Sequence, residues 1–135
     1  MKRTLQRRRK DHEEPYAISR RGWRYHHVGI PTTAPHPDDR HLRHLGIFVR
    51  SFDTSPFGIE CTRHSSECQV HELVRSVPHV AFEVDDLEKA VKGFKMLSGM
   101  SPSSEGVRVA MIVHDDAPIE LLEFSKDGKG HRTRQ

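Results

Sequence analysis

The chain has 135 residues, which is enough for one compact domain or for two small modules that share a core. Its formal net charge of +3 at pH 7 comes from its two ends. Residues 1–22 carry eight Lys or Arg and three acidic residues, residues 126–135 carry four and one, and the region between them has a net charge of −5. This distribution argues against nucleic acid as a partner of the central region.

Both ends are rich in charge and poor in apolar side chains, so we expect disordered basic arms at residues 1–22 and 126–135. No run approaches the ~20 apolar residues of a membrane-spanning helix, and the N-terminal stretch lacks the apolar segment of a secretory signal. Cys61 and Cys68 have neither zinc-site spacing nor the density of a disulfide scaffold. We therefore expect a reduced, soluble, cytoplasmic protein with no membrane partner.

The first half of the central region predicts a module of strands at residues 23–64. A proline-rich segment that contains Pro31, Pro35 and Pro37 follows the first strand, where a regular element would be interrupted. One helical turn is predicted from Asp38 to His44, because Asp38 and Asp39 favour a helix start. The expected strands are 23–30, 45–52 and 57–63. A polar connector at residues 65–76, with a short helix or coil near 70–74, leads to the second module.

The second module, residues 77–125, begins with a strand at 77–84. Asp85 is expected to cap a helix, because Glu88 stands at the spacing of a capping box. The helix ends either near Gly93 or, if its amphipathic period continues, near Leu97. An end at Gly93 predicts a strand at 94–99, a loop at 101–106 and strands at 107–113 and 118–124. The order is then β-α-(β)-β-β, against β-loop-β-β in the first module.

The two modules carry the same short motifs in the same order. His27-Val28-Gly29-Ile30 is followed by Ile59-Glu60, and His79-Val80-Ala81-Phe82 is followed by Ile119-Glu120. Two imidazoles and two carboxylates without a thiolate suit an octahedral divalent cation with two positions left for water or substrate. The repeat therefore predicts one metal site built from both modules. The competing interpretation is accidental proximity among 11 histidines and glutamates that face solvent.

Strand alternation separates candidates from their neighbours. If Glu120 points into the site, Leu122 and Phe124 share its face, and Ile119, Leu121 and Glu123 lie behind it. The adjacent histidines His26 and His27 are expected to face opposite sides of their strand. Alignment of the repeat selects His27 as the ligand and leaves His26 as a structural or surface residue.

The segments W-R-Y-H-H-V-G-I-P, V-P-H-V-A-F-E-V-D-D-L and I-E-L-L-E-F resemble the vicinal oxygen chelate superfamily, which includes glyoxalase I, extradiol dioxygenases and bleomycin-resistance proteins. The resemblance covers residues 23–125 and implies an α+β fold of paired βαβββ modules, whose mixed sheet curls into a cup. The first module's helix is reduced or missing, because the proline-rich segment stands in its place. Metal ligation is implied for His27, Glu60, His79 and Glu120, with Ni, Zn, Co, Mn and Mg all acceptable.

The activity that this resemblance implies is that of a metal-dependent lyase or isomerase. It stabilises an enolate or enediolate of a small metabolite with vicinal oxygens, and Glu60 or Glu120 acts as the base. Arg63, Lys95 and Arg108 are candidates for holding an anionic end of the substrate. The alternatives are a ligand-sequestering protein of the bleomycin-resistance type, an extradiol-type dioxygenase and a basic-armed nucleic-acid accessory protein. Whether the cup closes within one chain or between two stays open, and a homodimer is expected.

Overall fold

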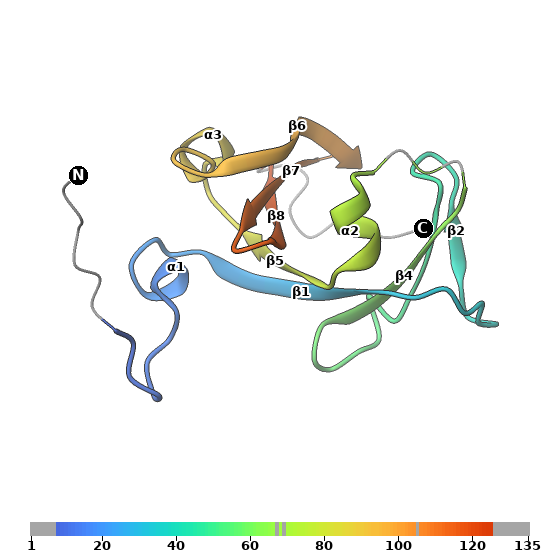
Figure 1. Cartoon of the computed structure of the whole chain (residues 1–135), viewed down its shortest axis with the longest axis horizontal. Helices are drawn as coiled ribbons and strands as arrows, with labels where there is room; N and C mark the ends of the chain where they lie inside the picture. The colour runs from blue at the N-terminus through green and yellow to red at the C-terminus, as the bar shows by residue number, and fades with distance from the viewer. Residues whose placement is uncertain (1–7, 67, 69, 105, 126–135) are drawn as a thin grey trace.

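The structure is a computed structural model that describes residues 8–66, 68, 70–104 and 106–125. Its elements form a mixed α+β fold with one sheet and a few short helices (Figure 1). In chain order the elements are α1 (Tyr16–Ser19), β1 (Arg24–Pro31), β2 (Arg40–Leu42), β3 (Ile47–Arg50), β4 (Ile59–His64), α2 (Glu72–Ser76), β5 (His79–Glu83), α3 (Leu87–Ala90), β6 (Lys95–Ser104), β7 (Val107–His114) and β8 (Ala117–Phe124).

The sheet consists of two copies of one four-stranded arrangement. Its strand order is β2-β3-β4-β1-β5-β8-β7-β6, so each module places its first strand beside its last strand. Those pairs, β1 with β4 and β5 with β8, are parallel, whereas β1 and β5 join the modules in antiparallel orientation. In Figure 1, β1 runs across the lower part of the view, with β6, β7 and β8 above it at one end and β2 and β4 at the other. The predicted fold of paired modules in a curled mixed sheet is confirmed, and the modules pair within one chain.

Apolar side chains on one face of the second module form the main core beneath α3. Leu87, Ile112 and Leu121 are fully buried there, and Trp23, from the chain just before β1, packs with them and is 7% exposed. On the other face of the same strands, Ala81, Val107 and Leu122 form a second cluster. The two faces follow from the alternation of neighbouring residues along β7 and β8. A smaller core of Leu42, Ile47, Val49 and Cys68 serves the first module.

The second module contains the helix and the additional strand that the sequence predicts. The cap lies one residue later than expected, because the Asp86 side chain accepts a hydrogen bond from the Lys89 amide. The helix ends before Gly93, whose φ of 84° turns the chain toward β6. The loop predicted at residues 101–106 is wrong, since β6 continues to Ser104 and pairs with β7 up to Val107. Pairing with β7 overrides the weak strand propensity of this Ser- and Pro-containing segment.

The first module differs from prediction where the proline-rich segment ends. The helical turn expected from Asp38 to His44 is wrong, because Arg40 to Leu42 form β2. This strand pairs with β3 through Leu42 and Ile47, and Gly46 adopts a φ of 69° between them. Ladder hydrogen bonds and burial of Leu42 stabilise a strand over a helical turn that would be too short to be stable by itself. Among the described residues, the first module has no helix between β1 and β4, as predicted.

The packed part of the chain begins before Trp23, within the arm expected at residues 1–22. Helix α1 lies there, Ala17 packs against the main core, and the Trp23 amide donates to the Ala17 carbonyl. Residues 1–7 and the tail expected at 126–135 lie outside the described residues. No helix in the described part of the chain is long and apolar enough to cross a membrane.

Candidate metal centre

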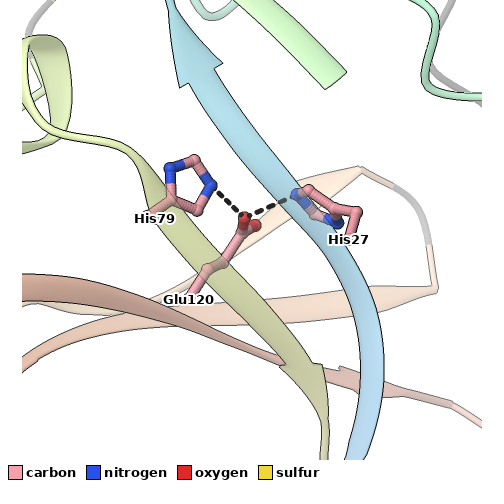
Figure 2. Close-up of side chains that lie close together, drawn as sticks. All are labelled: His27, His79 and Glu120. Carbon is pink, nitrogen blue, oxygen red and sulfur yellow. Dashed lines mark hydrogen bonds and ion pairs between the residues drawn. The ribbon is translucent and has the colours of Figure 1, made fainter. Parts of the chain in front are cut away.

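Three side chains from three strands meet at the centre of the sheet. The Glu120 Oε1 atom lies 3.1 Å from His79 Nε2 and 3.2 Å from His27 Nε2 (Figure 2). One ligand atom from each of these residues lies within 4.8 Å of the others. Glu60 approaches from a fourth strand, with its Oε1 atom 3.6 Å from His27 Nε2. All four residues selected from the repeat are therefore neighbours in one chain.

The strand register explains this convergence. In the antiparallel pair β1–β5, His27 lies opposite Ala81 and Gly29 lies opposite His79, so the two imidazoles stand two residues apart along the ladder. The parallel neighbours then add one acid each, since Glu60 pairs with Gly29 and Glu120 pairs with Ala81. The repeated motifs thus occupy equivalent places on the two sides of the β1–β5 pair. Each glutamate lies on the strand next to that of its module's histidine, on β4 beside β1 and on β8 beside β5.

Gly29 provides the space in which the His79 ring lies. A Cβ atom built on Gly29 would stand 2.2 Å from His79 Cε1 and 2.7 Å from His79 Nε2. Real Cβ atoms do not approach other atoms so closely. The equivalent position of the second module holds Ala81, which is fully buried opposite His27. The glycine in the first motif is therefore required by the imidazole of the second.

The cluster is largely buried. His27 is 1% exposed, Glu60 3% and Glu120 8%, and the His79 side chain is 12% exposed. His27 Nε2 is buried and makes no hydrogen bond within the described residues, although two carboxylates lie within 3.6 Å. Burial of carboxylates and an imidazole lone pair together is costly unless a cation compensates them. This donor set therefore fits a divalent metal ion bound by imidazole and carboxylate groups.

The predicted division of β8 into two faces is confirmed. Leu122 packs with Ala81 on the face that carries Glu120, whereas Leu121 packs in the core beneath α3. Glu123 belongs to that rear face, where its Oε2 atom accepts a hydrogen bond from the Leu87 amide. Glu123 thus supports the start of α3 and lies away from the cluster.

His26 does not face away from His27, so the expectation of strict alternation is wrong at this position. The β1–β5 register advances two residues on β1, from Tyr25 to His27, while it advances one on β5, which makes His26 the extra residue of a β-bulge. The bulge brings the Nδ1 atoms of His26 and His27 to 2.8 Å. Nothing in the sequence around His26 indicates this bulge.

Two arginines proposed to hold substrate lie away from the cluster. Arg63 pairs with Asp39 and its guanidinium stacks 4.0 Å from the Phe48 ring centroid. It alternates with the inward-facing Glu60 and Thr62 along β4. Arg108 pairs with Glu88 of α3 and with Glu123 on the rear face of the sheet. Neither arginine lies beside the candidate metal ligands.

Lys95 is exposed at the start of β6, the outermost strand of the second module. It pairs in register with Val113, and Met96 beside it packs in the core beneath α3. Lys95 therefore lies on the opposite face from that core, which is the face that carries Glu120. Lys95 thus lies on the face that carries Glu120 but two strands from β8.

Two further residues near the cluster were not selected from the sequence. Burial, followed by electrostatic interactions with Arg75 and His79, lowers the pKa of His64 below its usual value of 6.5. The Phe52 ring contacts the rings of both His26 and His27 at 5.6 Å between centroids. Phe52 also lines a neighbouring pocket of about 260 Å³ between β2 and the turn after β3. Neither residue belongs to the repeated motifs, so only their spatial positions connect them to the cluster.

Comparison with known proteins gives structural matches only. No protein-family model matches the chain, and no curated protein does so. A hypothetical protein, BH1468 from Bacillus halodurans C-125, aligns over 84% of this chain and 99% of its own, with 16% identity and a TM-score of 0.55. The two chains share a fold. A glyoxalase/bleomycin resistance protein/dioxygenase from Nocardioides aligns over 88% of this chain and 78% of its own, with 12% identity and a TM-score of 0.32.

Proposed function

We propose that the chain is a metal-dependent lyase or isomerase of the glyoxalase type, within the vicinal oxygen chelate superfamily, that acts on a small metabolite with oxygens on adjacent carbons. One observation carries the proposal. His27, His79 and Glu120 converge in a buried cluster where two repeated modules meet, and His27 Nε2 has no hydrogen bond within the described residues. All four candidate ligands lie on neighbouring strands of one chain, so the proposal does not require the expected homodimer.

His27, His79, Glu120 and Glu60 are the residues that would hold the metal ion. When bound, a divalent cation supplies Lewis-acid chemistry that stabilises the negative charge of an enolate or enediolate. Imidazole ligands suit Zn and Ni, and carboxylate ligands suit Mn and Mg, so the mixed donor set does not select among Ni, Zn, Co, Mn and Mg. Four protein donors would leave two positions of a six-coordinate ion for the two vicinal oxygens of a substrate.

Glu60 is the proposed general base. It is the member of the cluster that stands outside the compact group of His27, His79 and Glu120, yet it remains within 3.6 Å of His27. In the proposed reaction its carboxylate accepts the proton of the hydroxyl-bearing carbon and returns it to the adjacent carbonyl carbon, while the hydroxyl proton passes to the former carbonyl oxygen, so the C=O and C–OH groups exchange places. No redox partner is needed, because the proton and the electron pair both stay with the substrate. The closed surroundings of Glu60, which is 3% exposed, keep bulk water from competing for that proton.

Extradiol-type oxygenation is the second candidate, and the same geometry favours it in one respect. Two histidines and one carboxylate form the compact group, which is the donor set of non-haem Fe(II) oxygenases. Oxygen uptake by Fe²⁺-loaded protein in the presence of catechol would support this candidate over the isomerase. A ligand-sequestering protein predicts binding of an apolar ligand by wild type without any metal.

The first experiment measures metal binding. Wild type, His79→Ala and Glu120→Gln are titrated with Zn²⁺, Ni²⁺ and Mn²⁺ by calorimetry at pH 7.5, and their metal content is determined after dialysis. His114→Ala is the matched control, because the side chain of His114 is 66% exposed at the end of β7. We expect one ion per wild-type and control chain and at least ~100-fold weaker binding by the two site variants, since each loses one direct ligand. Equal affinity in all four proteins would refute the site.

The second experiment tests the base. Metal-loaded wild type and Glu60→Gln are incubated in D₂O with hydroxyacetone and lactaldehyde, two probes whose oxygens sit on adjacent carbons. We expect wild type to exchange the carbon-bound proton for deuterium and Glu60→Gln to lose that exchange when both proteins are saturated with the metal ion. Exchange that persists unchanged in Glu60→Gln would remove Glu60 from the proposed role.

A further inference from the structure

His26 lies beside the candidate ligand His27, and one ring nitrogen of each residue faces the other. Their Nδ1 atoms are 2.8 Å apart. Two imidazole nitrogens at this distance form a hydrogen bond when one of them carries a proton and the other offers a lone pair. The bond thus couples the tautomer of one ring to that of the other.

Backbone and packing both hold His26 in this position. The β-bulge between Tyr25 and His27 turns the His26 side chain onto the face of its neighbour. The His26 ring then packs against the rings of Phe52 and Phe124, each at 5.6 Å between centroids. His26 is therefore oriented by aromatic neighbours from two other parts of the chain.

The orientation has a consequence for His27. Its Nε2 atom faces Glu120 and Glu60, and coordination of a cation through Nε2 requires a lone pair there. A neutral ring with its lone pair on Nε2 carries its proton on Nδ1. A proton on His27 Nδ1 would lie between the two Nδ1 atoms, and His26 can accept it only in the tautomer that carries its own proton on Nε2.

We propose that His26 is a positioning residue that holds His27 in the tautomer with a free Nε2 lone pair directed at the metal ion. The inference rests on the proposed function, because it assigns a role toward the same ion. His26 acts through His27 and is not itself a ligand, since it lies outside the compact donor group and its Nδ1 atom is engaged with His27. Such outer partners commonly fix both ring orientation and tautomer at histidine metal sites.

The two histidine ligands of the repeat are not equivalent in this respect. His79 Nδ1 is buried and makes no hydrogen bond within the described part of the chain, whereas His27 Nδ1 bonds to His26. The second module has Pro78 where the first has His26, so it cannot reproduce the contact. The positioning role belongs to the first module alone.

Two variants separate the hydrogen bond from the packing. His26→Phe keeps an aromatic ring between Phe52 and Phe124 but removes the nitrogen, whereas His26→Asn places an amide oxygen near the position of Nδ1 as an acceptor. His41→Phe is the matched control, because His41 also stacks on an aromatic ring, that of Phe48 at 4.2 Å, but lies on β2 at the edge of the sheet. Zn²⁺ affinity is measured by competition with a chromophoric chelator. Imidazole ¹⁵N shifts of the Zn²⁺-loaded proteins report the His27 tautomer.

We expect His26→Phe to bind Zn²⁺ about 10–100-fold more weakly than wild type, and His26→Asn to recover most of the loss. His41→Phe is expected to match wild type. In wild type the ¹⁵N shifts should place the His27 proton on Nδ1. In the metal-free protein a low-field imidazole N–H resonance, shared between the two rings, should be present in wild type and absent in His26→Phe.

Distinct outcomes overturn the inference and the proposed function. Tight Zn²⁺ binding by wild type with no loss in His26→Phe overturns the positioning role and leaves the metal site intact. Equal losses in His26→Phe and His26→Asn also overturn it, because they assign the effect to packing. A wild-type protein that binds no divalent ion overturns the proposed function and the inference together.

Discussion

Replacement of Gly29 by alanine tests the geometry of the cluster without removal of any candidate ligand. The added Cβ would stand 2.2 Å from His79 Cε1, whereas an ordinary carbon–carbon contact is about 3.5 Å, so the ring must retreat by roughly 1.3 Å. Gly29 does not adopt a positive φ, so alanine is compatible with the backbone and the effect comes from the contact itself. A metal–nitrogen bond tolerates deviations of only about 0.2 Å.

Two changes should follow in Gly29→Ala. Zn²⁺ affinity should fall by at least ~10-fold, because His79 Nε2 moves away from the position it now holds 3.1 Å from Glu120 Oε1. Stability should fall by about 1–3 kcal/mol through overpacking of the sheet centre, which corresponds to a Tm lower by roughly 3–10 °C. Calorimetric titration with Zn²⁺ and thermal unfolding of the metal-free protein measure the two effects separately.

Gly99→Ala is the matched control for this substitution. Gly99 also lies within a strand, β6, but a Cβ atom there meets nothing within 4 Å. The control should bind Zn²⁺ like wild type and be at least as stable, since alanine loses less backbone entropy than glycine on folding. If Gly29→Ala matches the control in both affinity and Tm, the His79 ring does not occupy the position described, and the reasoning about the cluster fails.

Two more predictions concern charged residues outside the cluster. For Asp39, burial raises the pKa, but the His36 amide and the Arg63 and Arg50 side chains outweigh it and leave the pKa below its usual 3.8. Asp39→Asn should therefore lower the free energy of unfolding in urea by about 1–3 kcal/mol near pH 7. The difference should shrink as pH falls below 3.8 and disappear below the lowered pKa of folded Asp39, and a pH-independent difference would contradict this. Arg108→Gln should leave Zn²⁺ affinity unchanged within about twofold, because Arg108 pairs with Glu123 on the rear face of the sheet. A large loss of Zn²⁺ affinity would instead place Arg108 in the metal site.

Repetition made the main features of this protein predictable. Motifs that recur at corresponding places in two segments imply one supersecondary unit used twice, so the amino-acid sequence alone is enough to match His27 with His79. The period of two along a strand likewise separated Glu120 from Glu123, because one face of β8 packs beneath α3 and the other faces the cluster. These inferences succeeded because they depend on local backbone geometry.

Pairing between distant segments decided the features that the sequence did not predict. The sequence by itself determined the repeated motifs, most strands and the four residues that meet at the centre of the sheet. The tertiary structure decided that Arg40 to Leu42 form a strand, that Arg63 and Arg108 pair with acids away from the centre, and that a bulge turns His26 toward His27. Each of these depends on the register between segments far apart in the chain, and an individual segment carries no information about which partner its backbone groups will meet.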